Sequence, residues 1–259
     1  MKVNNLFCIV TGGSSGLGKA ITTLLSDNNC TVIVFDLQSP EASLFEKYKN
    51  LDFQRVDITN ESEIDSAFKY VNNKYNRLHV LINCAGIGHV ENILSIDNKK
   101  NTILHSTENF IKTMNINLTG TFLTCKYATL YMQQNDLDNK NNNDGELGVI
   151  INVASIAGIE GTIGQAAYAA SKGGIIGMSM PLARELGQYN IRLSTIAPGP
   201  IDTGIKMAEY ANKLKKMSVI GRFGYPHEFA ILAKHIIENQ YLAGSVIRMD
   251  GGLIKPNIY

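Results

Sequence analysis

Near its amino terminus the chain reads Leu6-Phe7-Cys8-Ile9-Val10-Thr11-Gly12-Gly13-Ser14-Ser15-Gly16-Leu17-Gly18. The apolar residues at 6–10 predict a buried strand, and the residues that follow the glycines keep a helical pattern to about Asp27. Glycines between a strand and a helix let the backbone approach a pyrophosphate closely, and the amino terminus of the helix favours an anion. The spacing is G-x-x-x-G-x-G, for which an ordinary glycine-rich turn is the alternative. The position between strand and helix favours phosphate binding.

Asp36 follows a second apolar run, residues 31–35, which predicts the next strand. A carboxylate about 20 residues beyond the glycines can accept a hydrogen bond from an adenosine ribose, and it repels a 2′-phosphate. Two unit charges ~4 Å apart repel each other by roughly 4 kcal/mol at an effective dielectric constant of ~20. The residues Leu37-Gln38-Ser39 bring no cation to receive a phosphate. We therefore expect NAD rather than NADP; the alternative is that Asp36 is a turn residue at a strand end.

Strands and helices alternate along the rest of the chain. Apolar runs predict further strands at residues 53–56, 78–82, 149–153, 191–196 and 245–249. Helical patterns cover residues 60–75, with Asn60 as the N-cap and Glu63 at N3. Further helical patterns cover residues 107–132, a segment that ends near residue 187, and a segment that begins at Pro226. This alternation, without repeats or an obvious linker, predicts an α/β fold. We expect one Rossmann-type domain over residues 1–259, with a doubly wound, mostly parallel sheet and helices on both faces.

Small and polar residues follow several of the predicted strands, at the edge where parallel sheets bind ligands. Asp57 can accept a hydrogen bond from an adenine amino group. The run Asn83-Cys84-Ala85-Gly86 lets the backbone lie close to a cofactor, with tight packing as the alternative. Pro198 and Gly199 end a strand and open a loop at the same edge. These positions extend the candidate cofactor site beyond the glycine-rich turn.

Three segments depart from the alternating pattern. Residues 89–106 are polar and mixed, without a clear period. Residues 133–146 are an Asn/Asp-rich stretch that we expect to be an exposed loop. Residues 203–221 mix lysines with apolar residues, and in this architecture such a segment is expected to cover the site as a lid.

Tyr168 and Lys172 are spaced i, i+4 in a predicted helix, which places both side chains on one face. An ammonium beside a phenol favours the phenolate. A free tyrosine has a pKa of about 10, so work near neutral pH requires a fall of about 3 units, or about 4 kcal/mol. Ser155 follows the strand at 149–153 and lies where a ligand is expected. A solvated helix face is the alternative for the Tyr–Lys pair, and Asn117, inside a predicted helix, is expected to face solvent.

The composition excludes several classes of protein. Hydrophobic residues at 44% and charged residues at 18% are an ordinary globular balance. The formal net charge of +1 offers no long-range field for nucleic acid or an anionic membrane. The four cysteines are scattered without metal-ligand spacing, so we expect free thiols and no metal. No apolar run reaches the ~18 residues of a membrane span. The first strand begins by about Leu6, which leaves no room for a signal peptide or a cleavable Arg-rich presequence.

Together these motifs resemble the short-chain dehydrogenase/reductase family over nearly the whole chain. The matching residues are Thr11-Gly12-x-x-x-Gly16-x-Gly18, Asn83-Cys84-Ala85-Gly86, Asn117, Ser155, Tyr168-x-x-x-Lys172 and Pro198-Gly199-x-x-x-Thr203. Cys84 departs from the family, which more often has asparagine there. Other stretches are similar to the 3-hydroxyacyl-CoA dehydrogenase branch of the family: residues 164–168, 171–175 and 236–239, and the lengthened segment after Gly86. Residues 203–221 match that branch poorly.

The resemblance implies roles for individual residues. Tyr168 is implied as the general acid/base, and Lys172 lowers its pKa and holds the nicotinamide ribose. Ser155 hydrogen-bonds the reacting oxygen, and Asn117 anchors a water in a proton relay. The implied NAD site consists of Gly12, Ser15, Gly16, Leu17, Gly18, Asp36, Asp57, Ile58, Cys84, Ala85, Gly86, Tyr168, Lys172, Pro198, Ile201 and Thr203.

The implied activity is the NAD-dependent interconversion of a 3-hydroxyacyl-CoA and a 3-oxoacyl-CoA in fatty acid metabolism. Other secondary alcohols such as hydroxysteroids are further candidate substrates. The resemblance also implies a homotetramer built on the helices around residues 107–132 and 165–187, and a mitochondrial location, with a cytoplasmic one as the alternative. One competing function is a 3-oxoacyl-carrier-protein reductase of the same family, against which Asp36 argues because such reductases usually use NADPH. Another is a scaffold role in a tRNA-modifying complex, against which the near-zero net charge argues.

Overall fold

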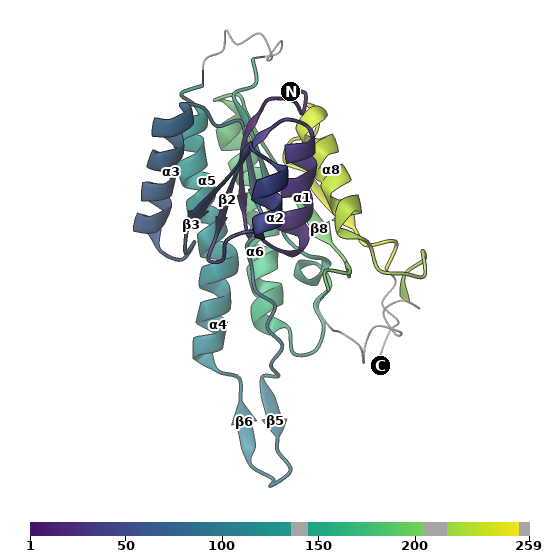
Figure 1. The fold of residues 1–259 in the computed structure, drawn as a ribbon. Coiled ribbons are helices and arrows are strands. Elements are labelled where there is room, and N and C mark those ends of the chain that lie inside the picture. Colours follow the sequence, from purple (N-terminus) through teal and green to yellow (C-terminus); the bar gives the residue numbers. More distant parts are fainter. Residues whose placement is uncertain (136–144, 205–216, 254–259) are drawn as a thin grey trace.

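A seven-stranded sheet forms the centre of the computed structural model, which describes residues 1–135, 145–204 and 217–253 (Figure 1). All of its pairings are parallel, in the order β3-β2-β1-β4-β7-β8-β9. The strands are β1 (Phe7–Thr11), β2 (Thr31–Asp36), β3 (Leu51–Arg55), β4 (Val80–Asn83), β7 (Gly148–Val153), β8 (Ile191–Pro198) and β9 (Val246–Met249). The predicted doubly wound parallel sheet is confirmed.

The strand order reverses between β1 and β4. From β1 the chain builds outward through β2 and β3, and from β4 it builds in the other direction through β7, β8 and β9. In open α/β sheets ligands bind in the crevice outside the carboxyl ends of the strands at such a reversal. The topology therefore places the expected site after Thr11 and Asn83, the last residues of β1 and β4.

Helices cover both faces of the sheet (Figure 1). Buried side chains of α1 and α8 pack on one face, and those of α3, α5 and α6 pack on the other. Because both faces are covered, the central strands are apolar almost throughout, as Val80, Leu81 and Ile82 show. The helices are α1 (Gly16–Asp27), α2 (Ala42–Lys47), α3 (Glu61–Tyr75), α4 (Thr107–Met114), α5 (Gly120–Met132), α6 (Ala166–Gly187) and α8 (Pro226–Glu238). No helix among the described ranges is long and apolar enough to cross a membrane.

Local sequence signals set several helix ends as expected. The side chain of Asn60 caps α3 by accepting hydrogen bonds from the backbone N–H groups of Ser62 and Glu63. Pro226 opens α8, where the Glu228 carboxylate accepts a hydrogen bond from the N–H of Tyr225 at 2.7 Å. The helix expected at 107–132 is not continuous, because a π-helical turn (Asn115–Thr119) separates α4 from α5.

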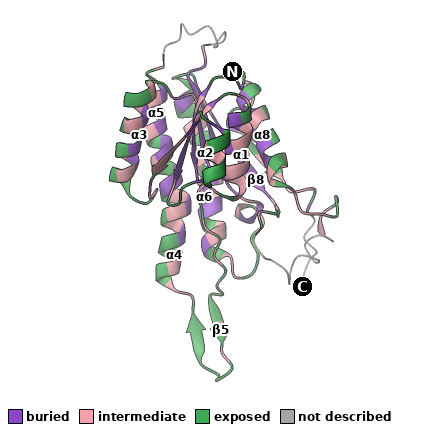
Figure 2. Cartoon of the chain, in the orientation of Figure 1, coloured by how far each residue is buried: buried purple, intermediate pink, exposed green. Residues whose placement is uncertain are grey.

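Residues 89–106, which have no sequence period, contain an antiparallel hairpin of β5 (Leu94–Ile96) and β6 (Thr102–Leu104). The hairpin projects away from the body below α4 and is exposed along its length (Figures 1 and 2). Neither face of such short strands is covered, so no alternation of apolar and polar residues marks them. Helix α2 is a second short element that the pattern did not reveal. The expected loop at 133–146 and the expected lid at 203–221 lie largely outside the described residues.

Candidate active site

The catalytic candidates meet at the carboxyl edge of the sheet. Ser155 lies just beyond β7 and caps a 3₁₀ turn, where its Oγ accepts a hydrogen bond from the N–H of Ala157 at 3.1 Å. Tyr168 and Lys172 lie in the first turns of α6. The Lys172 Nζ is 5.8 Å from the centre of the Tyr168 ring and donates to the carbonyl of Val153 at 2.8 Å. Lys172 is only 5% exposed, so the pair is not a solvated helix face.

Burial dominates the protonation of this pair. It lowers the pKa of Lys172 to about 8. It also raises the pKa of Tyr168, which a hydrogen bond with Ser155 partly offsets. The direction for Tyr168 is opposite to the lowering expected from its i, i+4 lysine. The physical reason is that Lys172 hydrogen-bonds the Val153 carbonyl and lies over the phenol ring rather than at its hydroxyl.

Asn117 faces the site, in the place that the family resemblance implied, and the solvent-facing position expected from its residue type alone is wrong. Its side chain is fully buried within the π-helical turn. Oδ1 accepts from the N–H of Ile87 at 2.8 Å, and Nδ2 donates to the Ile87 carbonyl at 2.9 Å and to Ser171 Oγ at 3.0 Å. Gly86 is needed beside it, because a Cβ there would lie 3.1 Å from Asn117 Oδ1 and 3.4 Å from Lys172 Nζ. Asn117 therefore ties the segment after β4 to the helix that carries Tyr168.

The glycine-rich turn is packed too tightly for any side chain at two positions. Gly12 has φ +64°, and a Cβ there would lie 2.8 Å from the backbone of Ala85. A Cβ at Gly18 would lie 2.1 Å from the carbonyl oxygen of Gly12. Ser15 precedes α1 and makes no side-chain capping bond within the described part of the chain. The amino terminus of α1 therefore points its N–H groups at the site edge without a side chain of its own to satisfy them.

Asp36 lies beside this turn at the end of β2. Its Oδ2 accepts from the N–H of Ser14 at 3.1 Å, and its Oδ1 accepts from the N–H of Gln38 at 3.2 Å. These bonds hold the carboxylate where β2 meets the glycine-rich turn. Just beyond the neighbouring strand β3, Asp57 Oδ1 accepts from the N–H and the hydroxyl of Thr59 at 2.9 and 2.7 Å. The two carboxylates thus lie at or just past the carboxyl ends of neighbouring strands.

The remaining cofactor candidates contribute backbone or apolar surface. Thr11 holds the turn after β4, since its carbonyl accepts from Cys84 N and its Oγ1 accepts from Ala85 N at 3.1 Å. Burial raises the pKa of Cys84 to about 12, which keeps its thiol neutral. The other predicted positions lie along the same edge. Leu17 packs on the core, Ile58 packs against Gly120, Pro198 ends β8, Ile201 pairs with Gly224, and the methyl group of Thr203 would be 3.6 Å from a Cβ at Gly16.

Two groups of the site carried no recognisable signal. The Val153 carbonyl, which holds Lys172, is a backbone atom and leaves no trace in residue type. Ser171 accepts from Asn117 and donates to the Tyr168 carbonyl at 2.7 Å, but a serine inside a helix has many ordinary roles. Its position directly before Lys172 is the one feature that could have drawn attention to it.

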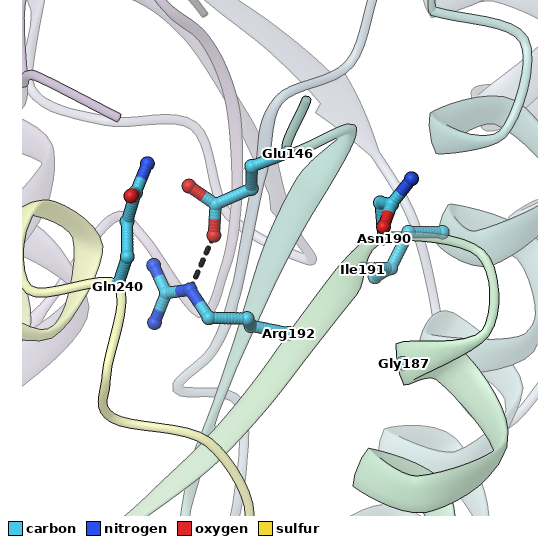
Figure 3. A pocket seen from close by; sticks show the side chains of 6 residues that line it. All are labelled: Glu146, Gly187, Asn190, Ile191, Arg192 and Gln240. Atoms are coloured by element: carbon cyan, nitrogen blue, oxygen red, sulfur yellow. Dashed lines mark hydrogen bonds and ion pairs between the residues drawn. The ribbon is translucent and has the colours of Figure 1, made fainter. Parts of the chain in front are cut away.

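A hollow of about 220 Å³ lies at the opposite edge of the sheet, near the start of β8 (Figure 3). Arg192 crosses it and pairs with Glu146. The Arg192 guanidinium also donates to the carbonyls of Ile236, Ile237 and Leu242 at 2.8–3.0 Å. Because its charged groups are already used to join β8 to α8, this hollow is structural and is not a competing ligand site.

Comparisons with known proteins agree on the family to which this chain is similar. A family model described as short chain dehydrogenase matches residues 7–214. A 3-hydroxyacyl-CoA dehydrogenase type-2 of Bos taurus is 38% identical, over 97% of this chain and 96% of that protein. A 3-oxoacyl-[acyl-carrier-protein] reductase of Thermotoga maritima is 35% identical, over 98% of this chain and 100% of that protein. The crystal structure of a 3-hydroxyacyl-CoA dehydrogenase type-2 from Mycobacterium avium gives a TM-score of 0.85 at 30% identity, covering 97% of both chains.

Proposed function

The chain belongs to the short-chain dehydrogenase family and is an oxidoreductase, and we propose that it interconverts 3-hydroxyacyl-CoA and 3-oxoacyl-CoA with NAD. The observation that carries the proposal is the Ser155–Tyr168–Lys172 group, with Lys172 buried, at the same carboxyl edge of the sheet as the glycine-rich turn after β1. Relatives named 3-hydroxyacyl-CoA dehydrogenase type-2, such as the bovine protein, support the substrate class.

The residues present fit a dinucleotide. Gly12 and Gly18 leave room for backbone alone, and the amino terminus of α1 offers N–H groups to a pyrophosphate. Asp36 would take the adenosine ribose, and Asp57 would lie beside adenine. Lys172 and the backbone at 84–86 would face the nicotinamide end. The cofactor supplies the hydride chemistry when bound.

The protein groups handle the proton at the substrate oxygen. In reduction, the Tyr168 hydroxyl donates its proton to the carbonyl oxygen, and the Ser155 hydroxyl donates a hydrogen bond to the same atom. The hydrogen bond between these two side chains means that both can reach one oxygen. A phenol whose pKa is raised by burial is protonated at neutral pH, as this direction requires. In oxidation Tyr168 takes up the proton as phenolate, and the proposed relay through Asn117 returns it to solvent. The Lys172 ammonium, which lies over the ring and does not reach the hydroxyl, would act on that phenolate through its charge alone.

The test is initial-rate kinetics with acetoacetyl-CoA and with acetoacetyl-carrier protein, each with NADH and with NADPH. We expect turnover of the CoA substrate with NADH. Preference for the carrier-protein substrate with NADPH would replace this proposal with the second candidate, a 3-oxoacyl-carrier-protein reductase, which the Thermotoga relative favours. Absence of turnover with every pair would discard both substrate classes and turn the search to other secondary alcohols, including hydroxysteroids.

The proposed assembly is a homotetramer in mitochondria. Large apolar side chains stay exposed on α4 and α5, namely Phe110, Ile111, Phe122 and Leu130, and such surface supports self-association. Light scattering after size exclusion should give four times the chain mass, and the mass of a monomer would reject the tetramer.

The proposed mitochondrial location follows from the resemblance to the acyl-CoA branch. Microscopy of the tagged protein would distinguish a mitochondrial location from a cytoplasmic one. The alternative scaffold role predicts co-purification with a methyltransferase and tRNA.

A further inference from the structure

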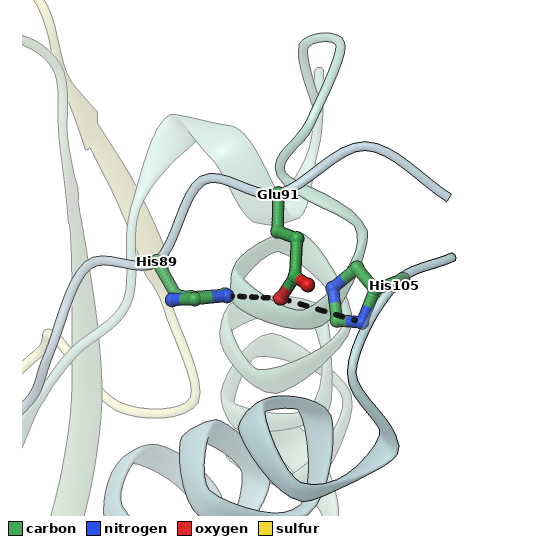
Figure 4. Close-up of side chains that lie close together, drawn as sticks. All are labelled: His89, Glu91 and His105. Atoms are coloured by element: carbon green, nitrogen blue, oxygen red, sulfur yellow. Dashed lines mark hydrogen bonds and ion pairs between the residues drawn. The ribbon is translucent and has the colours of Figure 1, made fainter. Parts of the chain in front are cut away.

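Two histidines and a glutamate meet where the β5–β6 hairpin leaves the body. His89 and Glu91 lie on the segment that enters the hairpin, and His105 lies on the segment that leaves it. Figure 4 shows the three side chains converging, with the Glu91 carboxylate between the two rings. From this geometry we infer that His89, Glu91 and His105 form a binding site for a divalent transition-metal ion, with zinc as the best match. Cysteine spacing alone gave no indication of a metal site, and the expectation of no metal rested on it.

The distances allow coordination with little movement. One ligand atom from each residue lies within 4.8 Å of the other two. His89 Nε2 is 2.7 Å from Glu91 Oε2, and His105 Nδ1 is 3.8 Å from the same oxygen. Ligand atoms of a tetrahedral zinc at 2.0–2.1 Å lie roughly 3.3 Å from one another. Side-chain rotations would bring His89 Nε2, a Glu91 carboxylate oxygen and His105 Nε2 to that separation.

His105 supplies a second, independent observation. Its side chain is only 5% exposed, and its Nδ1 lies 2.9 Å from the Ser106 carbonyl. A proton on Nδ1 donated to that carbonyl leaves the lone pair on Nε2. Nε2 is buried and has no hydrogen-bond partner among the residues the structure describes. Zinc-binding histidines commonly donate their other N–H to a backbone carbonyl in this way, so the ring is already set as a ligand.

Glu91 is likewise held and ionised. Its carboxylate accepts from the Ser106 N–H at 2.9 Å and from Asn109 Nδ2 at 3.0 Å. Hydrogen bonds from His89, then from Ser106 and Asn109, lower the pKa of Glu91 to about 2. The side chains of His89 and Glu91 are about one quarter exposed, which gives an ion a way in. Two imidazoles and one carboxylate leave a fourth position for water, a ligand set that suits zinc.

The ion would close the base of the hairpin. The hairpin has little core of its own, since Ile93, Ile96 and Leu104 are 67–76% exposed. A two-stranded hairpin without a packed face is marginal in water. A metal ion bound by both Glu91 and His105 would join the two ends of the segment that contains the hairpin. It would also restrain the chain that follows Gly86, where the N–H of Ile87 donates to Asn117 Oδ1. The site therefore has a structural role beside the catalytic edge, and it does not depend on the reaction proposed above.

Zinc binding by the full-length, tag-free, chelator-stripped protein tests the inference. Isothermal titration with zinc chloride should give one ion per chain, and His89→Gln, Glu91→Gln and His105→Gln should each weaken binding at least tenfold. His227→Gln is the matched control, because His227 lies in α8, outside the cluster, where its ring stacks on the N-cap residue Tyr225, and this variant should bind as the wild type does. If His105→Gln fails to fold, His89→Gln decides, since its side chain is only partly buried.

Cobalt distinguishes this site from the active-site thiol. The cobalt protein should show a tetrahedral visible spectrum without a thiolate charge-transfer band, and Cys84→Ser should leave that spectrum unchanged. Zinc should also raise the melting temperature of the wild type but not of His89→Gln. Binding that survives both histidine substitutions, dependence on Cys84, or no stoichiometric binding at all would overturn the inference, and none of these outcomes bears on the dehydrogenase reaction.

Discussion

The carboxyl edge of the sheet and the base of the β5–β6 hairpin each gather reactive side chains, but they hold them in opposite ways. At the sheet edge Lys172 is 5% exposed and its pKa is lowered by desolvation. At the hairpin Glu91 is partly exposed and its pKa is lowered by hydrogen bonds. The first cluster stands on a covered parallel sheet, whereas the second stands on a segment with few buried apolar contacts. Perturbations should therefore cost far more at the sheet edge than at the hairpin.

The largest expected effect is the loss of the proposed acid/base. Tyr168→Phe keeps the ring but removes the hydroxyl, so kcat with NADH and acetoacetyl-CoA should fall by about 10²–10⁴. Tyr189→Phe, at an exposed tyrosine just after α6, is the control and should retain activity. Circular dichroism should show both variants folded. A Tyr168→Phe enzyme with near wild-type kcat would remove Tyr168 from the mechanism.

Backbone crowding at the glycine-rich turn comes next. Gly18→Ala places a methyl 2.1 Å from the Gly12 carbonyl, so the free energy of unfolding should fall by about 3 kcal/mol and NADH binding should be lost. Gly187→Ala is the matched control, because nothing among the described residues lies within 4 Å of that position and it belongs to a helix. It should stabilise the protein by up to about 1 kcal/mol. Urea unfolding measures both, and equal stability of the two variants would contradict the close approach.

The buried lysine should make stability depend on alkaline pH. The pKa of Lys172 is about 8 in the folded protein against an ordinary 10.5, so the unfolded chain binds more protons between these values. Its contribution to stability therefore rises with pH, by about 2 kcal/mol from pH 8 to pH 10. The raised pKa of Tyr168 affects stability only at higher pH. Its stabilising contribution is complete below pH 10 and is lost as the pH rises above 10.

Urea unfolding of Lys172→Met checks this sign. The difference in unfolding free energy between wild type and variant should grow in favour of the wild type from pH 8 to pH 10. Lys69→Met, which removes an exposed i, i+4 partner of Asp65, should run parallel to the wild type over this range. Parallel curves for Lys172→Met as well would mean that the ammonium is not desolvated in solution.

Cofactor choice at the end of β2 is a smaller effect. Asp36→Asn removes the charge that would repel a 2′-phosphate but keeps an acceptor for Ser14 N–H. The ratio of kcat/KM for NADPH to that for NADH should rise at least about tenfold, or about 1.4 kcal/mol. Asp65→Asn, on the surface of α3, should leave the ratio unchanged. An unchanged ratio in Asp36→Asn would show that this carboxylate does not discriminate between the cofactors.

The hairpin should give the smallest response. The pKa of Glu91 is lowered to about 2 from 4.5, so its contribution is present above pH 4.5 and is lost as pH falls toward 2. Glu91→Gln should lose this acid dependence while unfolding normally at about pH 7. Urea unfolding at about pH 6 and about pH 3, without added metal, measures it. A larger acid loss than the alkaline change at Lys172 would reverse the comparison between the two regions.

The sequence by itself determined the parallel sheet, the glycine-rich turn and the Ser155, Tyr168 and Lys172 positions. Strand and helix periods, and spacings of four residues in a helix or a turn, are local properties that residue types report directly. The strand ends also follow, because parallel strands present their carboxyl ends at one edge. Helix boundaries agreed within a few residues, except where the π-helical turn interrupts 107–132.

Tertiary structure alone decided the direction of the Tyr168 pKa and the meeting of His89, Glu91 and His105. The inward position of Asn117 followed from the family resemblance but not from its residue type or its helical pattern. The π-helical turn directs Asn117 to Ile87, 30 positions away, and no local pattern records that contact. Whether an i, i+4 lysine lowers the pKa of a tyrosine depends on competing burial and on the carbonyl that the lysine meets. The histidine cluster exists because an exposed hairpin returns the chain beside its own start, and such non-local closure leaves no periodic signal in the sequence.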